Sequence, residues 1–105
     1  MHRIRESDPQ TTYCYSVRAE ADPSVLPRLL ALFAKRGLMP TALHARRYDH
    51  GTSALQVDIE ATGLDQQLAE YLQRCMRQIV AVDLVLLSTK HVLKPNDVWP
   101  VARAG

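Results

Sequence analysis

Histidine, serine, aspartate and cysteine are the residue types with which this chain could do chemistry. Its four histidines are His2, His44, His50 and His91, and the motifs Gly-x-Ser-x-Gly, His-Glu-x-x-His and a phosphate-binding glycine loop are all absent from the sequence. We therefore expect no catalytic residues and no enzyme activity. Of the four histidines, His44 is the one that we expect near an interface.

The two cysteines, Cys14 and Cys75, lie far apart in the sequence and form no Cys-x-x-Cys pair. This spacing is more typical of reduced thiols with a structural role than of a disulfide framework or a zinc site. We expect no metal site and no cofactor.

Length and charge narrow the class of protein further. The 105 residues suffice for one domain. The net charge is only +2 and the basic residues are dispersed, and both facts argue against nucleic-acid binding. The longest apolar run, "IVAVDLVLL", contains Asp83 and is much shorter than the roughly 20 residues that cross a bilayer. The N-terminal "MHRIRESDPQTT" lacks the apolar segment of a secretory signal, so we expect a cytoplasmic protein without a membrane segment.

The loop at residues 21–25, "ADPSV", is the remaining candidate for a site. If Ser24 is the N-cap of a helix, Pro27 is the third helical residue, where its missing N–H removes no intrahelical hydrogen bond. Free backbone N–H groups and the positive helix end could then hold a carboxylate. The alternative is that Asp22 and Ser24 only shape and cap the turn, and the residues alone leave both possibilities open.

The elements on either side of this loop follow from the spacing of apolar residues. Residues 13–21, "YCYSVRAEA", alternate as in a half-buried strand. The next helix is predicted to end before Gly37 in a left-handed position. We expect its core-facing stripe to consist of Leu26, Leu29, Leu30, Phe33 and Ala34.

The second half of the chain shows the same kind of patterns. The segments "TALHARRYD" and "TSALQVDIEA" are predicted to form an antiparallel hairpin around a turn at residues 49–51. Residues 80–88, "VAVDLVLLS", indicate a fourth strand that is largely buried. Between them, residues 62–79 indicate a second amphipathic helix, with a core side formed by Leu64, Leu68, Tyr71, Leu72, Cys75, Met76 and Ile79.

The order of elements predicts an α+β, ferredoxin-like βαββαβ two-layer sandwich, in which two helices cover one face of a four-stranded antiparallel sheet. Its bounds would be an N-terminal extension at 1–12, a domain at 13–88 and a C-terminal tail at 89–105, which Trp99 could anchor onto the sheet. The RNA-recognition motif shares this order but needs aromatic residues on its third strand, and this strand has none. A copper carrier of this fold would need Cys-x-x-Cys where the chain has "ADPSV". We set both aside.

Together with this order, the segment "ADPSVLPRLLALFAKRGLMPTAL" resembles an ACT domain, a regulatory module that binds amino acids or related small effectors between paired domains. The resemblance covers residues 13–88, and within the family the chain is most similar to the short regulatory small subunit of acetolactate synthase. This implies a homodimer, an amino-acid effector, allosteric control of a catalytic subunit and a role in branched-chain amino acid biosynthesis. A ligand-free assembly module of the same fold is the alternative.

The resemblance also implies where the effector binds. One wall would be Asp22, Pro23, Ser24, Val25 and Leu26, and the other, from a neighbouring chain, would be Gly37, Leu38, Met39 and Pro40. Many effector-binding members have glycine where this chain has Ser24. Exposed sheet edges favour pairing, and Tyr48, Leu38 and Met39 are the expected contacts.

Overall fold

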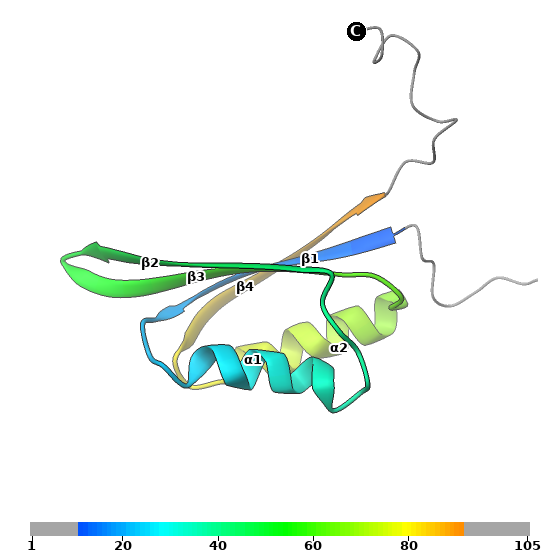
Figure 1. Cartoon of the computed structure of the whole chain (residues 1–105), viewed down its shortest axis with the longest axis horizontal. Helices are drawn as coiled ribbons and strands as arrows, with labels where there is room; N and C mark the ends of the chain where they lie inside the picture. The colour runs from blue at the N-terminus through cyan, green and yellow to red at the C-terminus, as the bar shows by residue number, and fades with distance from the viewer. Residues whose placement is uncertain (1–10, 92–105) are drawn as a thin grey trace, which may run out of the picture.

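The computed structural model describes residues 11–91, and the side chains of His50 and His91 are not described (Figure 1). The strands form one antiparallel sheet in the order β2-β3-β1-β4, and both helices lie on one face of it. The elements are β1 (Thr11–Glu20), α1 (Val25–Ala34), β2 (Ala42–His50), β3 (Thr52–Ala61), α2 (Gln66–Arg77) and β4 (Val82–His91). The predicted ferredoxin-like βαββαβ sandwich is confirmed.

The sheet extends beyond the expected domain of 13–88 at both ends, because β1 begins at Thr11 and β4 ends at His91. The rest of the N-terminal extension and of the tail, including Trp99, lies outside the described residues. The hairpin prediction is confirmed: His50 pairs with Thr52, and Gly51 between them has a φ of 87°.

The core lies between the sheet and the two helices. Tyr15 and Val17 on β1 and Val57 and Ile59 on β3 are buried and alternate with residues on the opposite, open face. Tyr15 connects the layers: its hydroxyl donates to the Ala69 carbonyl of α2 at 2.8 Å, and its ring meets the Phe33 ring of α1 edge-on, with centroids 6.0 Å apart.

The buried stripe of α1 consists of Val25, Leu29 and Phe33, so the predicted stripe was only partly right. Leu30 is 40% exposed and Ala34 is exposed. Each helical residue turns by about 100°, which places Leu30 about 100° from the centre of a stripe with four-residue spacing. The sequence could not show this angle, because leucines occur on several sides of α1.

The end of α1 is as predicted. Gly37 has a φ of 68°, the Leu38 N–H donates to the Phe33 carbonyl at 2.9 Å, and the Gly37 N–H donates to the Ala34 carbonyl at 3.0 Å. This pair of bonds is the Schellman motif, in which a residue with positive φ closes the helix.

Helix α2 begins later than Thr62 and Gly63, the residues at which the predicted segment opened. Asp65 is its N-cap, and the Asp65 carboxylate accepts a hydrogen bond from the Leu68 N–H at 2.7 Å. The helix buries Ala69, Leu72 and Met76, whereas Tyr71, which we expected in the core, is 40% exposed. Tyr71 therefore belongs to the surface of the helix layer.

Strand β4 was expected to be largely buried, and this is wrong for one of its faces. Val85 is buried, but Leu84 and Leu86 on the open face are 46% and 56% exposed. Val80 lies before the strand and is exposed. Because both helices lie on the same side of the sheet, they cover only one face of β4 (Figure 1).

Candidate effector site

The loop before α1 is organised by its own aspartate. The Asp22 carboxylate accepts hydrogen bonds from the Ser24 N–H at 2.8 Å and from the Ser24 hydroxyl at 2.9 Å. These two bonds hold the pKa of Asp22 below its ordinary value. The bond from the Ser24 backbone N–H has the largest effect, and the charge of Arg28 makes a smaller contribution. Ser24 is the N-cap residue, as predicted, but its side chain makes no capping bond to the helix.

Few backbone donors are left for a ligand at this helix start. The Ser24 N–H is bonded to Asp22, the Val25 N–H donates to the Asp22 carbonyl at 3.1 Å, and Pro27 has no N–H. In the described part of the chain only the Leu26 N–H of this turn has no acceptor. A ligand carboxylate would therefore compete with the Asp22 carboxylate for Ser24.

The second predicted wall lies at the other end of α1. The helix has 10 residues, and its ends are thus about 15 Å apart. Within one chain the structure does not bring residues 22–26 and 37–40 together, so a shared site needs a second chain, as the resemblance implied. In that segment Met39 is 83% exposed, whereas Leu38 packs partly against the core.

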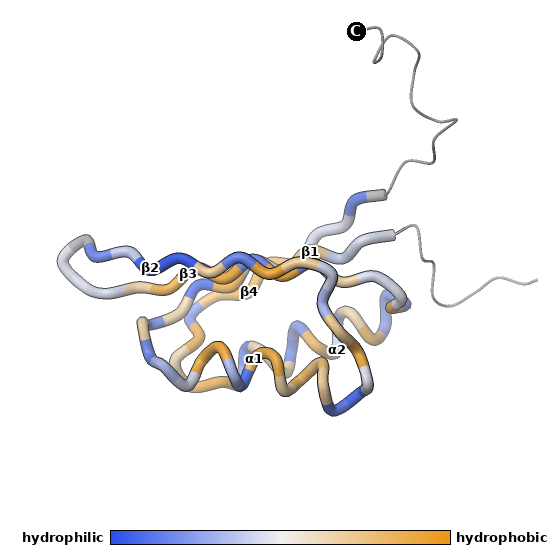
Figure 2. The backbone as a smooth tube through the Cα atoms, viewed as in Figure 1, coloured by the Kyte–Doolittle hydropathy of each residue, from blue (hydrophilic) through white to orange (hydrophobic). Residues whose placement is uncertain are grey.

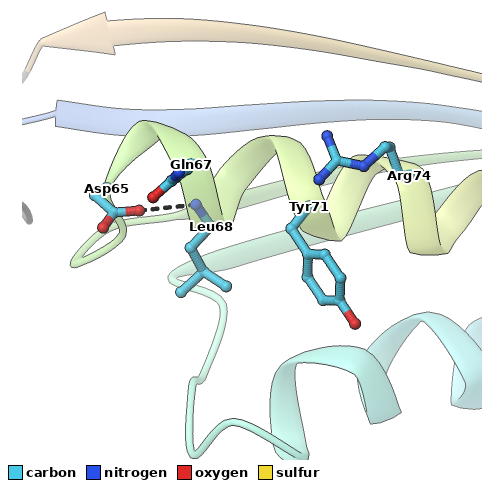
Figure 3. Close-up of a pocket in the computed structure, with 5 residues that line it drawn as sticks. All are labelled: Asp65, Gln67, Leu68, Tyr71 and Arg74. Atoms are coloured by element: carbon cyan, nitrogen blue, oxygen red, sulfur yellow. Dashed lines mark hydrogen bonds between the residues drawn. The ribbon is translucent and has the colours of Figure 1, made fainter.

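Among residues 11–91, three open cavities of similar size lie elsewhere, and none of these three is lined by the predicted effector residues. The first, about 370 Å³, lies on α2 (Figure 3). The second, also about 370 Å³, lies on the open sheet face and is lined by Arg18, Tyr48, Thr52 and Ala54. The third, about 310 Å³, is bordered by β1, the start of α2 and β4. The cavity on α2 is lined by Asp65, Gln67, Leu68, Tyr71 and Arg74.

The open sheet face brings Ser16, Asp58 and His44 into one cross-strand row. Asp58, rather than His44, occupies the middle strand, and the buried Gln56 amide donates to Ser16 Oγ at 2.8 Å and to Asp58 Oδ1 at 3.0 Å. A nucleophilic serine is commonly activated by a histidine, and here strand β3 separates His44 from Ser16. The row is a structural network of the sheet.

Thiols and carboxylates are the remaining groups of the chain that could bind a metal ion. Cys14 and Cys75 are both free, and burial, followed by the charge of Glu60, raises the pKa of Cys14. Among residues 11–91, no group of three or more His, Cys, Asp or Glu side chains is placed to hold a metal ion.

Fold and loop geometry together define a small α+β domain of the ferredoxin-like class. The chain belongs to the ACT-like domain family, whose model matches residues 6–94. Among solved structures, it is similar to the C-terminal domain of the MgtC protein from Mycobacterium tuberculosis, with a TM-score of 0.61 and 10% sequence identity over 80% of this chain and 92% of that one. At this identity the likeness shows the fold alone.

No curated protein matches the chain. The comparisons do not single out the small subunit of acetolactate synthase, so that narrower resemblance stays a prediction. Within residues 11–91, every helix is too short or too polar to span a bilayer.

Proposed function

We propose that this chain is a non-catalytic regulatory module that forms a homodimer, binds an amino acid at the dimer interface and changes the activity of a catalytic partner. Membership of the ACT-like domain family supports a regulatory, small-molecule-binding role. The observation that carries the proposal is the apolar outer surface of α1, because such a surface is normally covered by another protein chain. The two predicted walls of the site lie at the two ends of this helix.

Helix α1 is hydrophobic on nearly all sides: Arg28 is its one charged residue (Figure 2). A helix with this composition is normally covered on more than one side. Leu30 is nevertheless exposed, and Leu26, one turn away on the same side, is half-buried. We infer that a second copy packs against this side of α1 and against Met39, and that the symmetric contact brings the start of one α1 near the end of the other.

The loop offers groups for both ends of an amino acid. The Leu26 N–H is available to the ligand carboxylate, and the exposed Asp22 carboxylate, with its lowered pKa, is ionised at neutral pH and suits the ligand ammonium. Binding would rearrange the bonds between Asp22 and Ser24, so that Ser24 moves from Asp22 to the ligand carboxylate. The partner's residues 37–40 would close the site.

The catalytic partner that we propose is the large subunit of acetolactate synthase, on the earlier resemblance. The direct test is to add the purified chain to that subunit from the source organism. We expect a change in synthase activity that valine, leucine or isoleucine alters further. An unchanged activity at saturating chain would remove this partner.

A ligand-free assembly module is the second candidate, and one observation favours it. The hydrogen bonds from Ser24 to Asp22 already satisfy the turn without a ligand. In this case the chain would pair with another protein, and no amino acid would change its stability.

A thermal-shift screen against the twenty amino acids separates the two candidates, because a ligand that binds only the folded state raises the apparent melting temperature. Under the proposed function, one or more amino acids raise it, and Ser24→Leu abolishes the shift. Ser53→Leu is the matched control, since the Ser53 hydroxyl also donates to an aspartate, Asp49, in a different turn. No shift with any amino acid would favour the assembly module.

A further inference from the structure

Two arginines that are far apart in the sequence lie close to the Tyr71 ring. The guanidinium carbon of Arg36, in the turn after α1, is 4.6 Å from the centre of the Tyr71 ring. That of Arg74, one turn further along α2, is 5.9 Å from it. Stacking on the ring orients both cations. Neither arginine has a carboxylate partner among the described residues, so both keep their N–H donors for a ligand.

The cavity on α2 opens beside this cluster. In Figure 3 the guanidinium of Arg74 extends along the helix toward the end that carries Asp65 and Gln67, and Tyr71 projects toward α1. The volume of about 370 Å³ is at the lower end of the range for small-molecule sites, which suits a ligand of amino-acid size.

The lining has opposite charges at its two ends and apolar surface between them. Asp65 is held in place because its Oδ1 accepts from the Leu68 N–H at 2.7 Å. Its second carboxylate oxygen has no partner among the described residues. Arg74 lies at the other end, and Leu68 and the Tyr71 ring lie between. A molecule with one negative group, one positive group and an apolar part is complementary to this lining.

We propose that the α2 cavity binds an α-amino acid with an apolar side chain. Arg74, assisted by Arg36, binds the ligand carboxylate, for which a guanidinium offers paired donors. Asp65 accepts from the ligand ammonium, and the ligand side chain packs on Leu68 and Tyr71. The ligand class is that of the proposed function, but this site is separate from the dimer interface and lies within one chain.

The test is a titration of the full-length, ¹⁵N-labelled chain with L-leucine, followed by NMR, with 4-methylpentanoate and isopentylamine as analogues that lack the ammonium and the carboxylate. We expect L-leucine to shift the amide signals of residues 65–74, and each analogue to bind at least about tenfold more weakly, because each loses one charged hydrogen-bonding group.

Three variants complete the test. Arg74→Gln removes the charge at one end, and Asp65→Asn removes it at the other while keeping a good N-cap residue. Both should weaken L-leucine binding about tenfold or more. Arg77→Gln is the control, because Arg77 is an exposed arginine of the same helix that does not line the cavity. Circular dichroism confirms that each variant is folded.

The possible failures are distinguishable from those of the proposed function. Signal shifts confined to residues 22–26 and abolished by Ser24→Leu would overturn the α2 site and support the interface site. Shifts at residues 65–74 that survive Ser24→Leu would support the α2 site alone. Equal binding of 4-methylpentanoate and L-leucine, or no shift with L-leucine at millimolar concentration, would overturn the assignment of this cavity to an amino acid.

Discussion

Replacement of Tyr15 by phenylalanine removes one buried hydroxyl and keeps the ring. Tyr15 is 1% exposed, and its hydroxyl joins β1 to α2 through the Ala69 carbonyl. The edge-on contact with Phe33 would remain in the variant. The substitution therefore isolates the contribution of one hydrogen bond between the sheet and the helix layer.

The expected loss of stability follows from the hydrogen bond that the Ala69 carbonyl still accepts in the variant. Its carbonyl also accepts the ordinary helical bond from the residue four positions later, so the variant leaves it with one partner instead of none. The cost is then the net value of one hydrogen bond, about 1 kcal/mol, without the larger penalty of an unsatisfied buried group. For a domain of this size that lowers the melting temperature by about 4–8 °C.

The effect should depend on pH in a defined direction. Burial raises the pKa of Tyr15 well above its ordinary value, with a smaller contribution from Tyr13. Above about pH 10 the unfolded chain releases the Tyr15 proton and the folded chain keeps it, so the wild type loses stability as the pH rises. Tyr15→Phe has no such proton, and the stability difference between the two proteins should narrow above pH 10.

The assay is urea denaturation followed by circular dichroism at pH 7 and between pH 9 and 11. Tyr71→Phe is the matched control, because it removes a hydroxyl from a 40% exposed residue and should change the free energy of unfolding by less than about 0.5 kcal/mol. Equal losses in the two variants, or a Tyr15→Phe protein as stable as the wild type at pH 7, would refute the reasoning.

Three further predictions test the turn, the loop and the pairing. Gly37→Ala should cost about 1–2 kcal/mol in urea denaturation, because φ is 68°, and Gly37→Asn should cost less. Ser24→Ala should raise the NMR-measured pKa of Asp22 only part of the way to its ordinary value, because the backbone bond remains. The ionised Asp22 carboxylate contributes stability above its unfolded pKa, and this contribution is lost as the pH falls. In the variant this contribution should be smaller. Leu30→Lys should shift the chain from dimer to monomer in light scattering, and Leu86→Lys should not; the reverse result would place the contact on the open sheet face.

The sequence predicted the elements well because their signals are local. Ser24 and Pro27 defined the start of α1, Gly37 defined its end, and alternation defined β3 to the residue. The direction in which a helix faces the sheet is a tertiary property. In α1, leucines on several sides satisfy more than one choice of buried stripe, so Val25 was missed and Leu30 was misplaced.

The α2 cavity was missed for a related reason. An apolar ring at helical spacing predicts burial, and Tyr71 fits the spacing of Leu68 and Leu72. In the folded chain the Tyr71 ring meets Arg36, which is far away in the sequence and reaches the ring only after α1 and α2 have packed. No spacing within either helix could have indicated this contact.

Both proposed sites include residues that flank α1. Asp22 and Ser24 precede its first residue, Arg36 follows its last, and three fully buried side chains fix the helix on the sheet. A ligand held by Arg36 at the α2 cavity would restrain the turn at residues 37–40, which the partner chain needs for the interface site.

If this restraint favours the dimer, linkage requires that the dimer also binds the α2 ligand more tightly than the monomer does. L-leucine titrations above and below the dimer dissociation constant should then give two affinities. Their ratio squared should equal the factor by which saturating L-leucine strengthens dimerisation, because each dimer binds two ligands. A single affinity at both protein concentrations would show that the α2 cavity and the dimer interface act independently, and α1 would then be a rigid support rather than a link between sites.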